Sequence, residues 1–208
     1  MAARACGFGE RDRRVIDPPP IVQLTLTNPS LTQEQIIRKL RSPFSVIHCT
    51  LWNATTDEDK TTMPGVTDRR PQRRLMGTLV ASPFVGRDEN DEEGCFFCFP
   101  DLSCRTHGSY RLKFQLVILD PNKFQSGSSF PILSTTMSEP FQVFNAKDFP
   151  GMRASTSLTK KLKEQGCLIS VKKGNDKHTA AREDTPEEEE PGGDDSASSR
   201  ARGKRPKR

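Results

Sequence analysis

Residues 108–119 read Gly-Ser-Tyr-Arg-Leu-Lys-Phe-Gln-Leu-Val-Ile-Leu, and this stretch decides the fold of the 208-residue chain. One face of the extended chain would carry the apolar residues Tyr110, Leu112, Phe114, Leu116 and Ile118, and the other face Arg111, Lys113 and Gln115. A period of two over this length predicts a strand in a sheet with one buried face. We expect the strand to be central, because its apolar face is the longest in the chain.

Short apolar segments, separated by loops rich in Pro, Gly, Asp and Asn, lie on both sides of this stretch. Their spacing is typical of a β-sandwich or barrel. We predict further strands at residues 21–26, 44–53, 75–82, 95–99, 141–144 and 167–171. The segments at 54–74 and 86–94 are long and polar and predict loops. The predicted fold class is therefore mostly β.

Two short helices are expected among the strands. Thr32 and Gln35 have the spacing of a capping box ahead of a short apolar stripe, which predicts a helix over residues 32–41. A second helix is predicted over residues 157–165, because two leucines there lie four residues apart and Gly166 follows as a natural terminator.

The composition changes sharply near residue 173. Only 33% of the chain is apolar, and 16 residues are proline. Residues 174–208 contain no aromatic or aliphatic β-branched side chain, so they cannot bury enough apolar area to offset the entropy lost on ordering. We predict a folded domain over residues 1–173 and a disordered tail over 174–208, acidic first and then basic.

Positive charge is concentrated in the predicted domain. Residues 1–173 carry 24 Lys or Arg against 18 Asp or Glu, whereas residues 174–208 carry 8 against 9. This excess permits nucleic-acid binding but does not establish it, because many soluble domains are equally basic.

The six cysteines are expected to be reduced. No apolar signal-peptide stretch follows Met1 and no apolar run is long enough to span a bilayer, so we predict an intracellular chain with no membrane partner. A string with zinc-ligand spacing consists of Cys95, Cys98, Cys104 and His107. Phenylalanines lie within and beside its first pair, and residues three apart in a strand point to opposite faces. We therefore predict buried or half-buried thiols, no metal and no cofactor, with zinc as the alternative.

Catalytic motifs are not found in the sequence. It contains no Gly-x-Ser-x-Gly elbow, phosphate loop or His-Glu-x-x-His motif. His48 lies within an apolar strand pattern, and the acidic residues cluster in loops where solvation accounts for them. We predict a non-enzymatic protein without catalytic residues.

Arginines next to prolines are the most informative feature for function. Arg11, Arg13 and Arg14 stand directly ahead of Asp17 and the prolines at 18–20. A proline run restricts the backbone and acts as a stiff spacer, so these arginines would be held beside a strand, where they could meet a phosphate backbone. The alternative is a solvated basic N-terminus.

A second basic run repeats this pattern ahead of the strand predicted at 75–82. The further candidate DNA-binding residues are Arg69, Arg70, Arg73 and Arg74, together with Lys172 and Lys173 after the last predicted strand. If both arginine runs lie at the same end of a sandwich, they form one cationic rim for double-stranded DNA. The alternative is a set of scattered, solvated arginines.

The C-terminus carries a third basic run, on the predicted flexible tail. Its members are Arg200, Arg202, Lys204, Arg205, Lys207 and Arg208. The run suits a localisation signal read by a nuclear import receptor, and the alternatives are a weak phosphate-binding arm or a solubilising tail. We expect the protein in the nucleus, with a cytoplasmic pool.

Several motifs together resemble the velvet domain of fungal developmental regulators. The first is Ala-Arg-Ala-Cys-Gly-Phe-Gly-Glu-Arg-Asp-Arg-Arg at 3–14, followed by Asp-Pro-Pro-Pro-Ile-Val-Gln-Leu at 17–24. The match continues at residues 77–83, 97–103, 108–114, 149–152, 155–156, 158–159 and 162–166. The resemblance covers the chain in order from residue 3 to about residue 173, and the motifs together are highly specific.

The resemblance implies an immunoglobulin-like β-sandwich similar to the Rel-homology domain. It also implies DNA binding through loop arginines and lysines, and homo- or heterodimerisation with other velvet proteins. The implied roles are in spore development and secondary metabolism. Arg11, Arg13 and Arg14 match the family positions that contact DNA. The alternative is a velvet heterodimer partner that binds no DNA and acts as a nuclear adaptor.

Three features depart from the family pattern. Velvet domains usually begin with a further strand, whereas this chain starts almost on the first motif. We expect either a truncated start or a member without that edge strand, which would leave backbone groups exposed. The helical segment at 32–41 is longer than the usual loop, and no large insertion splits the domain. The paralogue stays open.

Overall fold

The strand β9 (Gly108–Ile118) lies at the centre of the largest of the three sheets in the described part of the chain. The computed structural model describes residues 1–8, 13–64, 72–124, 127 and 129–172. One edge of β9 pairs along its length with β3 (Ser45–Asn53), and the other edge pairs with β11 (Phe141–Phe144) and β10 (Ile132–Met137). The predicted central position is confirmed.

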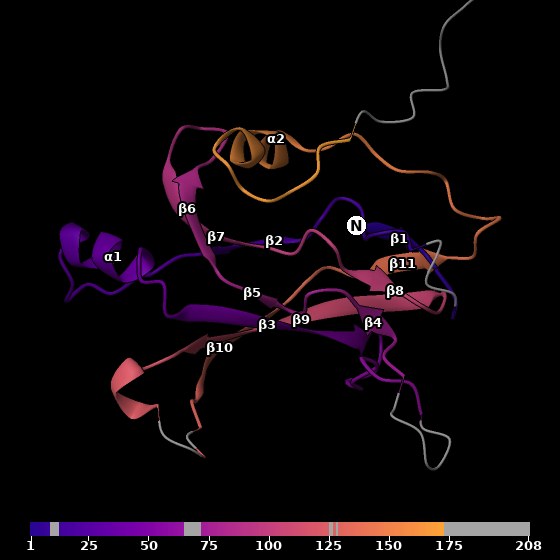
Figure 1. Cartoon of the computed structure of the whole chain (residues 1–208), viewed down its shortest axis with the longest axis horizontal. Helices are drawn as coiled ribbons and strands as arrows, with labels where there is room; N and C mark the ends of the chain where they lie inside the picture. Colours follow the sequence, from indigo (N-terminus) through magenta and orange to yellow (C-terminus); the bar gives the residue numbers. More distant parts are fainter. Residues whose placement is uncertain (9–12, 65–71, 125–126, 128, 173–208) are drawn as a thin grey trace, which may run out of the picture. The chain divides into compact units, whose positions relative to one another are not determined.

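Two short strands complete the larger sheet, whose order is β1-β11-β9-β3-β5, with β10 also on β9. At one end β1 (Ala2–Arg4) runs parallel to β11, and at the other β5 (Val80–Ala81) pairs with β3. The outer edge of β1 is partly covered, because the N–H and C=O groups of Ala2 exchange hydrogen bonds with those of Asp17 at 2.7 and 2.8 Å. Figure 1 shows these strands in one layer.

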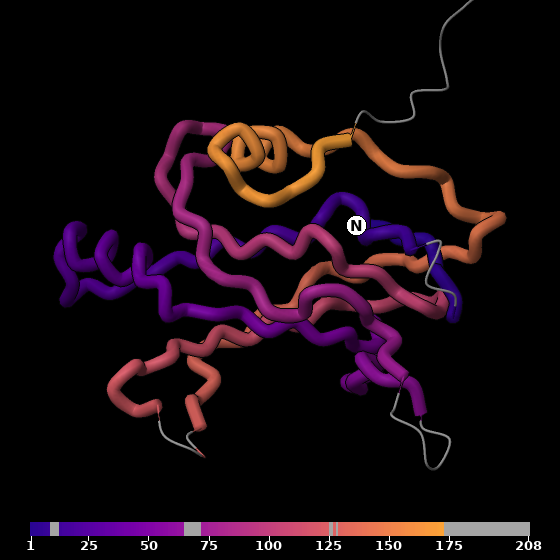
Figure 2. Tube along the Cα trace, in the orientation of Figure 1, coloured from indigo at the N-terminus to yellow at the C-terminus, as the bar shows by residue number. Residues whose placement is uncertain are grey.

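A second, smaller sheet faces the first. Its order is β2-β7-β6, formed by β2 (Ile21–Leu24), β7 (Glu93–Cys98) and β6 (Pro83–Arg87), and a separate pair is formed by β4 (Leu75–Met76) and β8 (Ser103–Cys104). Figure 2 shows the smaller sheet above the larger one. The apolar face of β9 is buried between them, and the Phe114 and Phe99 ring centroids lie 5.3 Å apart. Ile118, predicted on that buried face, is instead 45% exposed because the strand ends there.

Both helices were predicted correctly, within one residue at each end. The capping box of α1 (Gln33–Leu40) is present, with Thr32 and Gln35 exchanging hydrogen bonds. The second helix, α2 (Ser157–Glu164), has Gln165 as its C-cap and is followed by Gly166, which has a φ of +96°. In the described part of the chain, no helix is long and apolar enough to cross a membrane.

The helix α2 covers the outer side of the smaller sheet and builds a second apolar cluster. This cluster contains Phe96, Leu162, Cys167 and Ile169, all buried. Phe96 joins this cluster, whereas its neighbour Phe97 joins the main core, because successive strand residues point to opposite faces. One strand of the smaller sheet therefore contributes to both apolar clusters.

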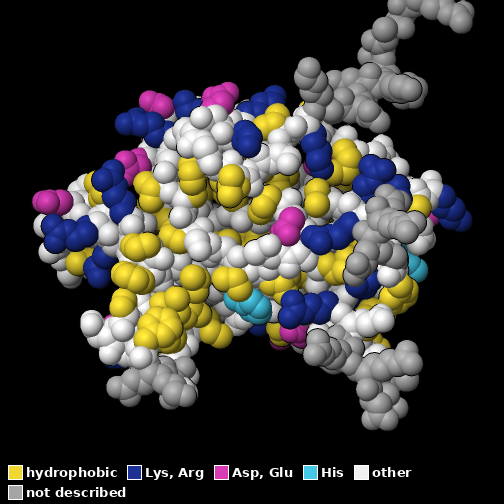
Figure 3. Space-filling model, viewed as in Figure 1, with side chains coloured by type: hydrophobic (Ala, Val, Ile, Leu, Met, Phe, Trp, Pro, Cys, Tyr) yellow, Lys and Arg dark blue, Asp and Glu magenta, His cyan; other side chains and the backbone are white. Residues whose placement is uncertain are grey.

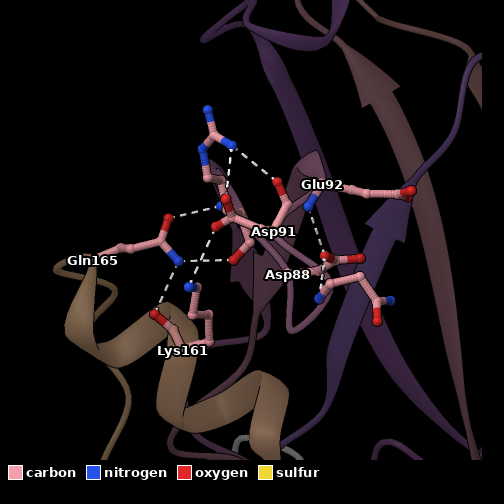
Figure 4. Close-up of polar contacts among 7 residues, drawn as sticks. Asp88, Asp91, Glu92, Lys161 and Gln165 are labelled. Atoms are coloured by element: carbon pink, nitrogen blue, oxygen red, sulfur yellow. Dashed lines mark hydrogen bonds and ion pairs between the residues drawn. The ribbon is translucent and has the colours of Figure 1, made fainter.

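The end of α2 is fastened to the β6–β7 hairpin by polar contacts (Figure 4). The Gln165 amide accepts from the N–H of Arg87 and donates to its carbonyl, both at 2.7 Å, as a neighbouring strand would. Lys161 Nζ lies 3.4 Å from Asp91 Oδ1. Asp88 Oδ1 accepts from the backbone N–H of Asn90 and Glu92 and closes the turn.

The mostly β fold class is confirmed, but two strand predictions are wrong. Residues 75–82 form two short strands, β4 and β5, because Gly77 turns the chain with a φ of +109°. Residues 167–171 form no strand: the Cys167 N–H bonds back to Leu162 O and the Ile169 N–H to Cys167 O, so the backbone pairs locally. Four strands were not predicted, namely β1, β6, β8 and β10. The predicted tail at 174–208 lies outside the described residues.

Replacement of Gly77 by alanine is predicted to destabilise the fold, both because of the positive φ of Gly77 and because of the atoms around it. A Cβ there would lie 2.5 Å from the carbonyl oxygen of Asp101. Gly151 has a similar φ of +104°, but a Cβ added there would meet nothing within 4 Å, so Gly151→Ala isolates the cost of φ alone. We expect Gly77→Ala to lower the free energy of unfolding by about 2 kcal/mol more than Gly151→Ala in urea denaturation. Equal losses would show that this contact does not matter.

Candidate nucleic-acid interface

The short strand β8 brings together two described segments that flank the arginine runs. On one side, the N–H groups of Cys6 and Gly7 donate to the carbonyls of Cys104 and Arg105, each at 3.0 Å. On the other side, β4 pairs with β8 through Leu75 opposite Cys104. The chain just before the first arginine run and the chain just after the second therefore lie on opposite edges of the same two-residue strand.

Arg13 is anchored to the turn before β8. Its Nε donates to Ser103 Oγ at 2.9 Å and its Nη2 to the Asp101 carbonyl at 2.5 Å, and Nη2 lies 3.5 Å from Asp101 Oδ2. The Asp101 carboxylate in turn accepts from the N–H and hydroxyl of Thr78. Gly77 allows this approach, since its side is occupied by the Asp101 carbonyl and Arg13 Nη2. With 36% of its side chain exposed, Arg13 both holds the turn and presents one edge of its guanidinium.

Arg74 is also held by several acceptors. Its Nε donates to Thr106 Oγ1 at 2.9 Å, and its Nη1 donates to the carbonyls of Lys60 at 2.6 Å and Thr62 at 3.3 Å. The half-buried side chain thus joins the loop at 60–62 to the turn after β8. Its primary role is to hold these two segments together.

Arg105 belongs to this group, and sequence reasoning missed it. Its Nε donates to the Arg73 carbonyl at 2.9 Å and its Nη1 to the Gly7 carbonyl at 3.2 Å, so one guanidinium joins the second arginine run to the segment that precedes the first. The guanidinium carbon also lies 5.9 Å from the ring centroid of Phe8, a cation–π distance. In the sequence Arg105 stands alone beside Cys104, and no local pattern marks it.

The remaining candidates differ in their placement. Arg14 and Arg73 are exposed, whereas Lys172 is half-buried. The Lys172 N–H donates to Ser155 Oγ at 2.9 Å and its carbonyl accepts from the Ser155 N–H. The candidates outside the described residues are Arg11, Arg69, Arg70, Lys173 and the C-terminal run Arg200, Arg202, Lys204, Arg205, Lys207 and Arg208.

The aspartate–proline junction is held at both ends. The N–H of Ile16 donates to the Leu102 carbonyl at 2.7 Å, beside the turn that binds Arg13. Asp17 is buried, and its carboxylate accepts from the N–H of Arg153. The backbone of Asp17 also exchanges hydrogen bonds with Ala2 in β1. The chain that follows Arg13 and Arg14 is therefore bonded both to β1 and to the segment before β8.

We refer to Arg13, Arg14, Arg73, Arg74 and Arg105 as the basic rim. Figure 3 shows Lys and Arg side chains gathered on the right of this face, over the region where Figure 1 labels β4, β8 and β11. Fixed guanidinium groups suit planar, bidentate recognition of phosphate oxygens. The positive charge and the N–H donors of the basic rim are therefore suited to a polyanion.

The cysteine–histidine string does not converge on one point. Cys95 and Cys104 are buried in the main core, whereas Cys98 contacts Cys167 in the second cluster. Burial raises the pKa of Cys95 to about 11 and that of Cys104 to about 12, so both are neutral thiols at physiological pH. Among the described residues no three His, Cys, Asp or Glu side chains form a group that could hold a metal ion.

The fold and the basic rim define a mostly β domain with a cationic surface around one short strand. The family described as Velvet factor matches residues 1–68 and 59–176. The chain belongs to the velvet family, as its motifs predict.

Similar proteins are named as developmental regulators. The chain is 67% identical over 177 residues to the sexual development regulator VELC of Pyricularia oryzae, covering 85% of this chain and 40% of that protein. It is 58% identical over 196 residues to the sexual development regulator velC of Gibberella moniliformis, covering 93% and 42%. It is 56% identical over 176 residues to the spore development regulator vosA of Beauveria bassiana, covering 85% and 64%. The chain thus spans less than two thirds of each of these relatives.

Neighbouring arginines are predicted to differ sharply in their effect on stability. Arg74→Met removes three hydrogen bonds from a half-buried guanidinium and should lower the free energy of unfolding by about 2–3 kcal/mol. The exposed Arg73→Met is the matched control and should change it by less than about 0.5 kcal/mol. Thermal or urea unfolding of both variants tests this. Similar losses would contradict the anchoring role of Arg74.

Proposed function

We propose that this chain is a non-enzymatic velvet regulator of sporulation and development that binds double-stranded DNA through the basic rim. The observation that supports this proposal is the double-sided pairing of β8, which gathers arginines from three separate segments. The names of the similar proteins support the developmental role. A role in secondary metabolism is proposed with it, from the family resemblance.

The anchored and the exposed arginines have different proposed roles. Arg13, Arg74 and Arg105 set the shape of the surface, because their guanidinium groups bind backbone carbonyls of neighbouring segments. Arg14 and Arg73, whose side chains are exposed, are the proposed phosphate contacts. The further proposed contacts are Arg11, Arg69, Arg70, Lys172 and Lys173.

Nuclear entry is proposed to depend on the C-terminal basic run. Arg200, Arg202, Lys204, Arg205, Lys207 and Arg208 would be read by a nuclear import receptor, and the protein would divide between nucleus and cytoplasm. This follows from the charge pattern of the run alone.

A second candidate function is that of a velvet heterodimer partner and nuclear adaptor. The observation that favours it is the edge strand β10, whose residues are all exposed. Among the described strands β10 pairs only with β9, so its outer backbone groups can bond another chain. Ile132 and Leu133, at 54% and 56% exposure, add apolar contact area. We propose that homo- or heterodimers with other velvet proteins form at this edge.

DNA binding by the basic rim predicts a salt-dependent gel shift that charge reversal weakens. We expect the double variant Arg14→Glu with Arg73→Glu to bind a mixed-sequence duplex about tenfold or more weakly. The slope of log K against log salt should also become less negative, by about 0.9 for each phosphate contact that is lost. Arg13 is left intact, because its reversal would also break the ties to Asp101.

The matched control for this experiment is a double reversal on α1, Arg38→Glu with Lys39→Glu. It changes the net charge equally, and Arg38 has an 83% exposed side chain. Figure 1 shows α1 at the opposite end of the larger sheet from β8. Equal weakening by both pairs would indicate a general charge effect, and unchanged affinity in the rim variant would exclude the basic rim as the site.

Association through β10 predicts sensitivity to charge at its edge. Leu133→Lys should weaken self-association, or association with a velvet partner, by about tenfold in analytical ultracentrifugation, because it places an ammonium in an apolar contact. The control is Leu168→Lys, at a residue that is 85% exposed beyond α2. If Leu133→Lys associates like the unmodified chain, dimerisation uses another surface.

A further inference from the structure

Two cysteines from distant parts of the sequence meet beneath α2. The Sγ atoms of Cys98 and Cys167 lie 3.3 Å apart, although 69 residues separate them in the chain. Cys98 is the last residue of β7, and Cys167 follows Gly166 directly after the end of α2. A bonded pair of sulfur atoms lies about 2.0 Å apart, so a small side-chain adjustment would bring these two into bonding distance.

The packing around the pair holds it in place. Cys167 is buried with Phe96, Leu162 and Ile169, and Cys98 is half-buried against the same cluster. At the C-terminal end of α2, Gln165 binds the backbone of Arg87 through hydrogen bonds at 2.7 Å. This end of the helix is therefore tied to β6 by the Gln165 amide, and the free thiols of Cys98 and Cys167 lie in contact beside it.

We propose that Cys98 and Cys167 are a modification site at which a peroxide forms a disulfide that fastens the end of α2 to β7. This site lies apart from the basic rim and does not depend on the proposed DNA binding. The pair differs from the other cysteines: Cys49, Cys95 and Cys104 are buried in the main core, and Cys6 donates from Sγ to the Cys104 carbonyl.

The chemistry needs two thiols and one hydrogen peroxide. The Cys167 thiolate attacks one peroxide oxygen, the O–O bond breaks, and the departing hydroxide takes a proton to become water, leaving a sulfenic acid. The Cys98 thiolate then attacks the Cys167 sulfur, the S–O bond breaks, and the second hydroxide leaves as water. Two thiols are oxidised and one peroxide is reduced to two waters.

The electrostatic surroundings of the two thiols favour Cys167 as the sulfur that reacts first. Burial raises the pKa of both thiols. At Cys167 the hydrogen bond between the two thiols, the Leu168 N–H and the charge of Lys163 lower the pKa and partly offset the effect of burial, so the thiolate is better stabilised there. Because the thiolate is the nucleophile, the reaction rate should rise about tenfold per pH unit between about pH 7 and pH 8.5.

The experiment treats the full chain with hydrogen peroxide, blocks remaining thiols under denaturing conditions and maps the tryptic peptides. We expect a cross-link between the peptides 88–105 and 164–172, which contain Cys98 and Cys167. The melting temperature should rise by about 10 °C, since the bond closes a long loop in the unfolded chain. Cys98→Ser and Cys167→Ser should each abolish the cross-link and the shift, whereas Cys6→Ser should retain both.

The peptide 88–105 also contains Cys95 and Cys104, so the Cys98→Ser variant assigns the bond. The cross-link is first mapped in the unmodified protein, so this part of the test does not depend on whether a variant folds. The proposal is overturned if Cys98 and Cys167 both remain open to alkylation after oxidation, or if the cross-link survives in Cys98→Ser.

Discussion

The backbone of residues 103–105 is hydrogen-bonded on both of its edges, and the whole basic rim depends on this double pairing. Cys6 and Gly7 occupy one edge and β4 occupies the other. A two-residue strand is too short to hold two neighbours by its ladder alone. Side chains complete the connection, since Arg105 bonds to the carbonyls of both Gly7 and Arg73.

Arginine suits this region because one guanidinium can bind several acceptors in a plane and keep its charge. Arg13 and Arg74 use that capacity inward, on carbonyls of neighbouring loops and turns. Their positive charge still contributes to the field at the surface. The same residues thereby stabilise the loops and keep a positive charge near the surface, where the Arg14 and Arg73 side chains are also exposed.

Elements with a strong local pattern were predictable from the sequence. The strand at 108–118 and both helices follow from periodicity and capping, which involve residues close together in the chain. The failures at 75–82 and 167–171 have a different cause. The first depends on the approach of Asp101 to Gly77, and the second on the packing of Cys167 and Ile169 under α2. Neither Asp101 nor α2 belongs to the segment whose structure it changes.

The sequence by itself determined the family, the mostly β fold class and the arginine runs next to prolines, because these reside in residue types and their spacing. Only the tertiary structure decided how each arginine is used. Arg13 and Arg74 bind carbonyls from distant segments, Arg105 joins the group without any local signal, and Cys98 meets Cys167 across 69 residues. These relations depend on which backbone segments lie side by side, and a one-dimensional pattern does not contain that information.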